Sequence, residues 1–139
     1  MKLAPLFFAV ILLAGSSAGH SQEPKSFACT FASGSAFIYD QGRFNAEPAG
    51  TMTFDIGAIN AEAQTAEMSS RRGPVSLRTV LASHATHFIE VGNDGFLNVT
   101  TIYDHEPGQA EYPAAHSRHF AVLGQPLVSQ FLGVCKPKT

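Results

Sequence analysis

The two cysteines of the sequence limit its folding more than any other feature. Cys29 and Cys135 are the only cysteines in the 139 residues, and they stand near the start and the end of the chain. In an exported protein, which meets an oxidising compartment, we expect such a pair to form one disulfide rather than a metal site or a reactive thiol. Closing a loop of about 100 residues is worth about 4–5 kcal/mol in the chain-entropy model, a large share of the stability of a small domain.

The N-terminus predicts export. The segment MKLAPLFFAVILLAGSSAGHSQ begins with Lys2, continues with an apolar run over residues 3–14 and ends in small residues, which is the pattern of a secretory signal peptide. We expect residues 1–18 to be this signal, with cleavage after Ala18. Because the apolar run is shorter than the ~20 residues that span a bilayer, we expect no stable membrane insertion after cleavage and a periplasmic or secreted protein. Residues 19–25 would then form a flexible N-terminal segment and residues 26–139 a single domain.

The rest of the sequence alternates apolar and polar residues at every second position. In TMTFDI, for example, Met52, Phe54 and Ile56 share one side, and FACTF, FLNVTTIY, HFAVL and LVSQFLGVC follow the same pattern. This alternation predicts half-buried β-strands, and Asp94-Gly95 between two such runs predicts a tight hairpin. We expect about eight strands, over residues 26–33, 35–40, 51–57, 64–69, 75–82, 86–92, 95–103 and 117–134, the last broken at Gly124.

Three segments are expected to lie between strands. Residues 40–50 and 104–113 are polar and predict longer loops. The alanine-rich residues 58–68 predict either one helical turn or a loop.

The expected disulfide decides how these strands are arranged. Short connections favour antiparallel pairing between neighbours along the chain. The first and last strands of an open sheet of this kind lie far apart, whereas a disulfide requires Cα atoms within about 7 Å. We therefore predict an all-β fold, a small antiparallel closed barrel whose terminal strands are joined by Cys29 and Cys135. A β-sandwich with facing terminal strands is the alternative.

The charge of the chain argues against nucleic acid as a partner. The formal net charge is −2, and 14% of the residues are charged. Arg71 and Arg72 form an isolated basic pair, whereas binding to phosphates needs clustered cations. The low charged fraction is typical of a packed domain.

Two H-x-x-H segments are the best candidates for chemistry. HATHF contains His84 and His87, and HSRHF contains His116 and His119. Residues three apart on a strand point to opposite faces, so a zinc site would need one histidine from each segment, completed by a side chain from the loop at residues 104–111. The interpretation that we favour is that these histidines lie at strand ends, face solvent or cap loop carbonyls, and bind no metal or other cofactor.

The sequence gives little support to an enzyme. It contains no H-E-x-x-H motif, no dinucleotide-binding G-x-G-x-x-G and no P-loop. The carboxylates Asp104, Glu106 and Glu111 share one polar loop, where solvation is their usual role. Tyr112 and Arg118 are interpreted as packing and ion-pair residues. We predict no catalytic residues and a non-enzymatic protein.

The C-terminal segment YPAAHSRHFAVLGQPLVSQFLGVC resembles that of a group of small exported proteins of alphaproteobacteria, chiefly rhizobia-like bacteria, to which no function is assigned. The resemblance implies export and supplies no site residues. In architecture the chain is also similar to periplasmic inhibitors of C-type lysozyme, which are small antiparallel barrels with a cysteine near each end. Their inhibitory loop motif is absent here, so their function is not carried over.

Three classes of function stay open at this point. The favoured one is an exported, non-enzymatic binding or interaction module for a protein or small-molecule partner. The second is a metal-binding protein that uses histidines of the two H-x-x-H segments. The third is an enzyme whose site the sequence does not reveal.

Overall fold

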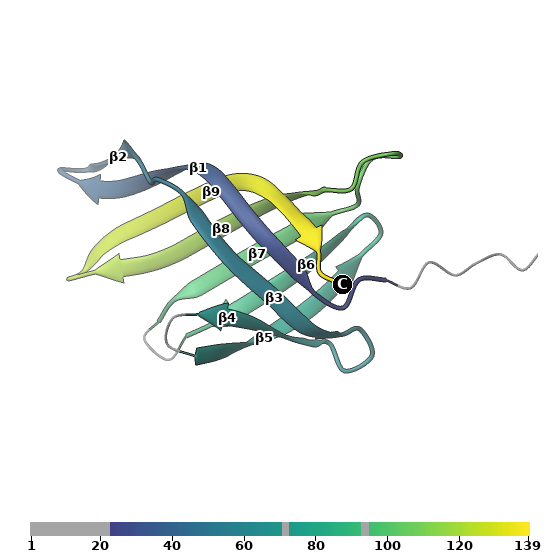
Figure 1. Ribbon diagram of the computed structural model, residues 1–139. Helices are drawn as coiled ribbons and strands as arrows, with labels where there is room; N and C mark the ends of the chain where they lie inside the picture. The colour runs from purple at the N-terminus through teal and green to yellow at the C-terminus, as the bar shows by residue number, and fades with distance from the viewer. Residues whose placement is uncertain (1–22, 71–72, 93–94) are drawn as a thin grey trace, which may run out of the picture.

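The structure of the protein is a computed structural model, which describes residues 23–70, 73–92 and 95–139. The expected signal peptide therefore lies outside the described residues. Within them the chain forms nine β-strands and no helix, so no helix that would cross a membrane is present there (Figure 1). The strands are β1 (Phe27–Asp40), β2 (Arg43–Pro48), β3 (Met52–Asn60), β4 (Thr65–Ser70), β5 (Gly73–Ala82), β6 (Ala85–Val91), β7 (Leu97–Tyr103), β8 (Tyr112–Val122) and β9 (Gln125–Pro137).

Eight of the strands close into an antiparallel barrel, which confirms the predicted fold. Each of β3 to β8 pairs with the next strand along the chain, and β1 pairs with both β3 and β9. Cys29 and Cys135 are direct partners across the β1–β9 pair, with Cα atoms 4.0 Å apart, and they form the expected disulfide. A disulfide of this kind indicates an oxidising compartment outside the cytoplasm.

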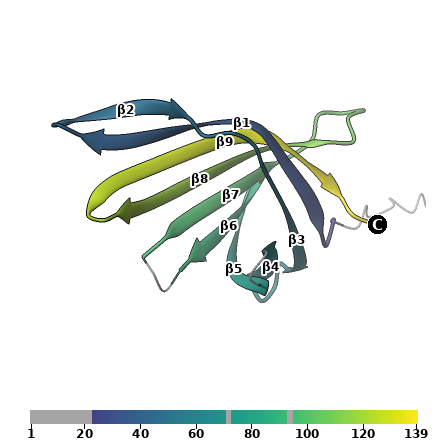
Figure 2. The same cartoon turned by 60° about the vertical axis from the view of Figure 1, so that its left-hand side comes forward.

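The prediction of a long polar loop over residues 40–50 was wrong. The chain instead turns within two residues, Gln41 and Gly42, whose φ angles of 50° and 82° are both positive, as a tight hairpin requires. It then forms β2, which pairs with the second half of β1 outside the barrel (Figure 2). The polar residues of this segment are consistent with a strand that is exposed on most of its surface.

The strands predicted over residues 26–33 and 35–40 form one continuous strand, β1. An irregularity in its pairing with β9 between Thr30 and Ser33 changes which side chains point inward. Gly133 makes this irregularity possible, because a Cβ atom there would lie 2.1 Å from the carbonyl oxygen of Thr30. The seam of the barrel therefore depends on a residue without a side chain.

The remaining connections agree with the turn signals of the sequence. Residues 58–68 contain no helical turn, because β3 extends to Asn60, residues 61–64 form a turn and β4 starts at Thr65. Residues 104–111 form the expected loop. Strands β6 and β7 pair as the expected hairpin does, and the predicted turn at Asp94-Gly95 falls partly outside the described residues, which omit Asp94.

The inside of the barrel is mostly apolar and is lined by alternate residues of the eight strands that close it. Phe31 and Phe54 stack with ring centroids 5.4 Å apart, and Phe88 lies almost fully buried on the opposite side of the barrel. Four polar side chains are also buried there. They are Thr79, Thr100, His116 and Ser129.

Candidate functional site

A cavity of about 450 Å³ opens at the end of the barrel where β1 begins, and we call this opening the mouth. The turn at residues 61–64, the β5–β6 turn and the loop at residues 104–111 surround it. Its inner walls are apolar, and its rim is polar and carries both charge signs. The wall residues are Phe27, Ile59, Phe88, Ile102 and Tyr112, and the rim includes Glu23, Lys25, Asp104 and His105.

The depth of the mouth cavity follows from the strand pattern. Phe27, Phe88 and Ile102 are inward-facing residues, with exposed fractions of 6%, 1% and 4%. They lie close to the ends of β1, β6 and β7, and no described residue fills the space above them toward solvent. Ligand sites in proteins combine an apolar cavity of ~300–1,000 Å³ with a few polar groups, which is the composition found here.

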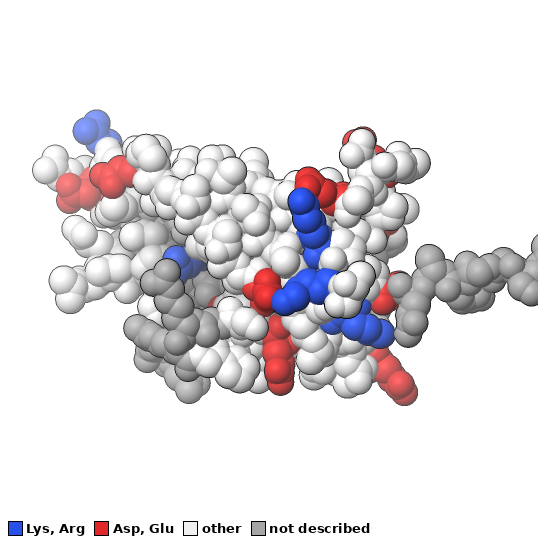
Figure 3. All heavy atoms as spheres, viewed as in Figure 1, with Lys and Arg blue, Asp and Glu red and all other residues white. Residues whose placement is uncertain are grey.

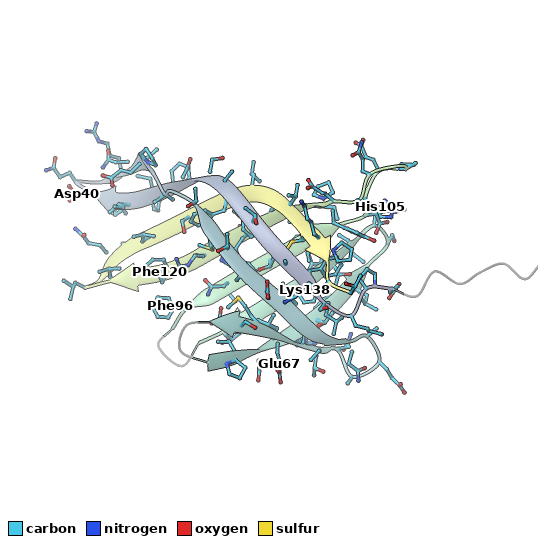
Figure 4. All side chains as sticks on the ribbon, viewed as in Figure 1. Asp40, Glu67, Phe96, His105, Phe120 and Lys138 are labelled. Carbon is cyan, nitrogen blue, oxygen red and sulfur yellow. A yellow bond between two sulfur atoms is a disulfide. The ribbon has the colours of Figure 1, made fainter. Side chains whose placement is uncertain are left out.

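One side of the mouth is an aromatic wall. The rings of His105 and Tyr112 meet edge to face with centroids 4.8 Å apart, and Tyr112 also contacts Phe27 at 5.2 Å. His105 Nδ1 lies 3.0 Å from the carbonyl oxygen of Glu106, which fixes the ring within its loop. A second hollow lies behind this wall, against Gln109 and the last residues of β9. Figure 4 shows His105 at the mouth and Asp40 at the opposite end of the molecule.

His84 is also near the mouth, where it pairs with Asp104. His84 Nδ1 and Asp104 Oδ2 are 3.1 Å apart, and both side chains are well exposed. Because both side chains are exposed, the pair is a solvated surface contact.

His116 occupies a position that sequence reasoning did not foresee. We expected a strand-end histidine at the surface, but its side chain points into the barrel and is 3% exposed. Its ring lies among Phe31, Phe54 and Phe131, and its Nδ1 shares a hydrogen bond of 2.8 Å with Thr100 Oγ1. The expectation was wrong because His116 belongs to the inward alternation of a longer β8 than the sequence indicated.

Burial makes His116 a neutral base. Removing the imidazole from water, with a smaller contribution from the positive charge of Arg118, lowers its pKa from 6.5 to about 4. The ring is therefore uncharged at neutral pH. It acts as a hydrogen-bonded part of the core.

The structure does not bring the two H-x-x-H segments together. His87 lies on the outside of β6, where its Nδ1 is 2.9 Å from Thr101 Oγ1, and His116 lies inside the barrel two strands away. His119 is exposed on β8. In the described part of the chain, no three histidine, cysteine or acidic side chains are grouped as metal ligands.

Tyr112 and Arg118 were expected to be packing and ion-pair residues, and both make contacts with aromatic rings. Tyr112 packs against Phe27 and His105. Arg118 places its guanidinium 5.4 Å from the ring centroid of Phe120, a cation–π contact, and it belongs to none of the ion pairs of the described residues.

Charged side chains of both signs are mixed on the face of the molecule shown in Figure 3, with uncharged areas between them. Near the mouth Lys136 pairs with Glu111 at 2.9 Å, and Lys138 pairs with Asp55. Each cation therefore stands beside an acid rather than adding to a basic patch.

Sequence reasoning did not identify the mouth cavity. Alternation shows that Phe27, Phe88 and Ile102 face inward, but it does not show that nothing packs on top of them at one end. The available signal was the long polar loop at residues 104–113, since long loops at the end of a barrel often carry function. No protein-family model matches the chain, and no curated protein matches it.

Proposed function

We propose that the protein is an exported, non-enzymatic binding module that holds a small amphipathic molecule in the mouth of its barrel. The observation that carries this proposal is the cavity of about 450 Å³ with apolar walls and a polar rim. Export to the periplasm or the exterior is part of the proposal. It is supported by the signal-peptide pattern of residues 1–18 and by the disulfide.

The chemistry of the cavity limits the ligand. Phe27, Phe88 and Ile102 offer dispersion contacts and no hydrogen bonds, so the part of the ligand that enters first is aliphatic or aromatic. The ammonium group of Lys25 at the rim can donate hydrogen bonds and the carboxylate of Asp104 can accept them, so the other part of the ligand is polar and stays near solvent. The volume suits a molecule of metabolite size rather than a peptide chain.

Binding of 8-anilinonaphthalene-1-sulfonate, a dye with apolar rings and one sulfonate, tests the proposal. We expect the folded protein without residues 1–18 to bind one dye molecule with an increase in fluorescence. Ala61→Trp should abolish this binding, because Ala61 lines the cavity and an indole there would fill it. Ala63→Trp is the matched control, since Ala63 belongs to the same turn, is exposed and does not line the cavity.

Two results would contradict the proposal. One is the absence of saturable dye binding to the folded protein. The other is equal binding by both alanine variants, with folding checked by circular dichroism. Export is tested separately by recovering the protein from the periplasmic fraction and measuring its mass. The mass should be that of a chain that begins at Gly19.

A further inference from the structure

Strand β2 forms a hairpin with the second half of β1, and this hairpin extends beyond the barrel. Residues 27–31 of β1 pair with β3, and residues 35–40 of β1 pair with β2 on the same edge and in the same register. Strand β9 occupies the other edge of β1 along both stretches. We call β2 together with residues 35–40 of β1 the arm. Figures 1 and 2 show the arm at the end of the molecule opposite the mouth.

The outer edge of the arm has unpaired backbone groups. Within residues 23–70, 73–92 and 95–139, β2 pairs with no strand other than β1. The amide of Ala49 donates to the carbonyl of Gly34, and hydrogen-bonded pairs alternate along an antiparallel ladder. Asn45 and Glu47 are therefore bonded to β1. The N–H and C=O groups of Phe44 and Ala46 point to the open edge.

We infer that a second copy of this chain pairs with β2 at this edge, so that two antiparallel β2 strands join two barrels in a symmetric dimer. When Asn45 lies opposite Asn45 of the second copy, Phe44 of each copy lies opposite Ala46 of the other. These are the residues whose backbone groups face outward, so four main-chain hydrogen bonds form. A shift by two residues in one direction would place Pro48, which has no N–H, opposite Phe44.

The charges of β2 favour the same register. With Asn45 at the two-fold axis, Arg43 of each copy stands directly opposite Glu47 of the other, on the same face of the sheet. Both side chains are exposed, and neither has an ion-pair partner of its own within the described residues. Charged edge strands normally discourage pairing, but this order of charges is complementary to itself in antiparallel orientation.

Apolar contacts on the other face of β2 add to the pairing. Phe44 is 53% exposed and meets Tyr39 of its own arm edge to face, with ring centroids 5.1 Å apart. In the dimer the ring of Phe44 lies across from Ala46 of the second copy, whose small side chain leaves room for it. Cross-strand pairs of this kind stabilise sheets, and a symmetric contact provides two of them.

Charge reversal with analytical ultracentrifugation, from micromolar to millimolar protein, tests this inference. We expect the protein without residues 1–18 to show a concentration-dependent monomer–dimer equilibrium. Arg43→Glu and Glu47→Arg should each weaken association by about tenfold or more, because each places like charges opposite one another twice. The double variant, and an equimolar mixture of the two single variants, should restore the dimer.

Two further variants separate this edge from other surfaces. Ala46→Pro removes an outward N–H and should abolish the dimer while leaving the monomer folded. Glu67→Arg on β4 is the matched control for charge, because Glu67 is exposed and points away from the arm (Figure 4), and it should not change association. A monomer at all concentrations would overturn the inference. So would a dimer that is insensitive to Arg43→Glu and Ala46→Pro.

Discussion

The buried imidazole of His116 predicts that acid destabilises the protein through one identified side chain. The pKa of His116 is about 4 in the folded state because of burial, and we take the ordinary value of 6.5 for the unfolded chain. Between pH 4 and pH 6.5 the imidazole of His116 is therefore mostly protonated in the unfolded chain and mostly neutral in the folded protein. The contribution of the neutral ring to stability is thus fully present above about pH 6.5, decreases as the pH falls, and is lost near pH 4.

The size of this effect follows from the two pKa values. One pKa unit corresponds to about 1.4 kcal/mol, so the full loss is on the order of 3 kcal/mol, of which about 2 kcal/mol is lost between pH 7 and pH 5. Because the ring is 3% exposed, solvent screening reduces this figure little. A loss of this size is a large fraction of the ~5–15 kcal/mol that stabilises a typical domain.

Urea unfolding of the oxidised protein at pH 7 and pH 5 measures this loss. Other groups also titrate in this range, so the informative quantity is the difference between variants. His116→Gln keeps a hydrogen-bonding side chain but does not titrate, and it should lose about 2 kcal/mol less than the wild type between the two pH values. His119→Gln, on the exposed side of the same strand, should lose as much as the wild type. Equal pH dependence of His116→Gln and the wild type would refute the reasoning.

Three shorter predictions concern the closure of the barrel and metal binding. Cys29→Ser removes the bond to Cys135, which spans 106 residues, and should reduce the free energy of unfolding in urea by about 2–5 kcal/mol; an unchanged value would contradict a stabilising disulfide. Gly133→Ala should lower the free energy of unfolding by about 1–3 kcal/mol, because the new Cβ atom would meet the backbone of Thr30. Gly57→Ala is the control and should lower it by less than about 1 kcal/mol, because the nearest contact there is at 3.8 Å. Zinc should not change the melting temperature, since His116 lies inside the barrel, and His87 and His119 lie outside it on strands that β7 separates; a rise of several degrees at neutral pH would contradict this placement.

The closed barrel could be predicted because two independent constraints in the sequence agree. Alternation fixes the strands, and the positions of Cys29 and Cys135 require the first and last strands to meet. Strand ends were less predictable. Phe31 and Gly34 both face inward although they are three residues apart, because the irregularity after Thr30 shifts the alternation by one residue. Ser33-Gly34-Ser35, which contains this shift, has the composition of a turn, which is why one strand was predicted as two.

The site was harder to predict than the fold. Histidine draws attention because it binds metals and carries protons, yet the chain uses His116 as a core residue whose polar atom is satisfied by Thr100. The cavity at the mouth instead depends on which end of the barrel is left uncovered. That property comes from loop conformations, which are set by tertiary contacts, and the pattern of residues in the strands does not encode it.

The arm shows how a missed strand changes what the molecule can do. The segment IYDQGRFN holds the signal for a tight turn in Gln41-Gly42, but its charged and polar residues resemble those of a loop. A strand that is buried on neither face and paired on one edge needs no apolar alternation, so core packing does not restrict its residues. In β2 the order Arg43, Asn45, Glu47 places opposite charges across from each other when two copies of the strand pair in antiparallel orientation. A strand that the barrel does not need for closure is therefore available to join two barrels, and its position opposite the mouth would leave both mouths open in the dimer.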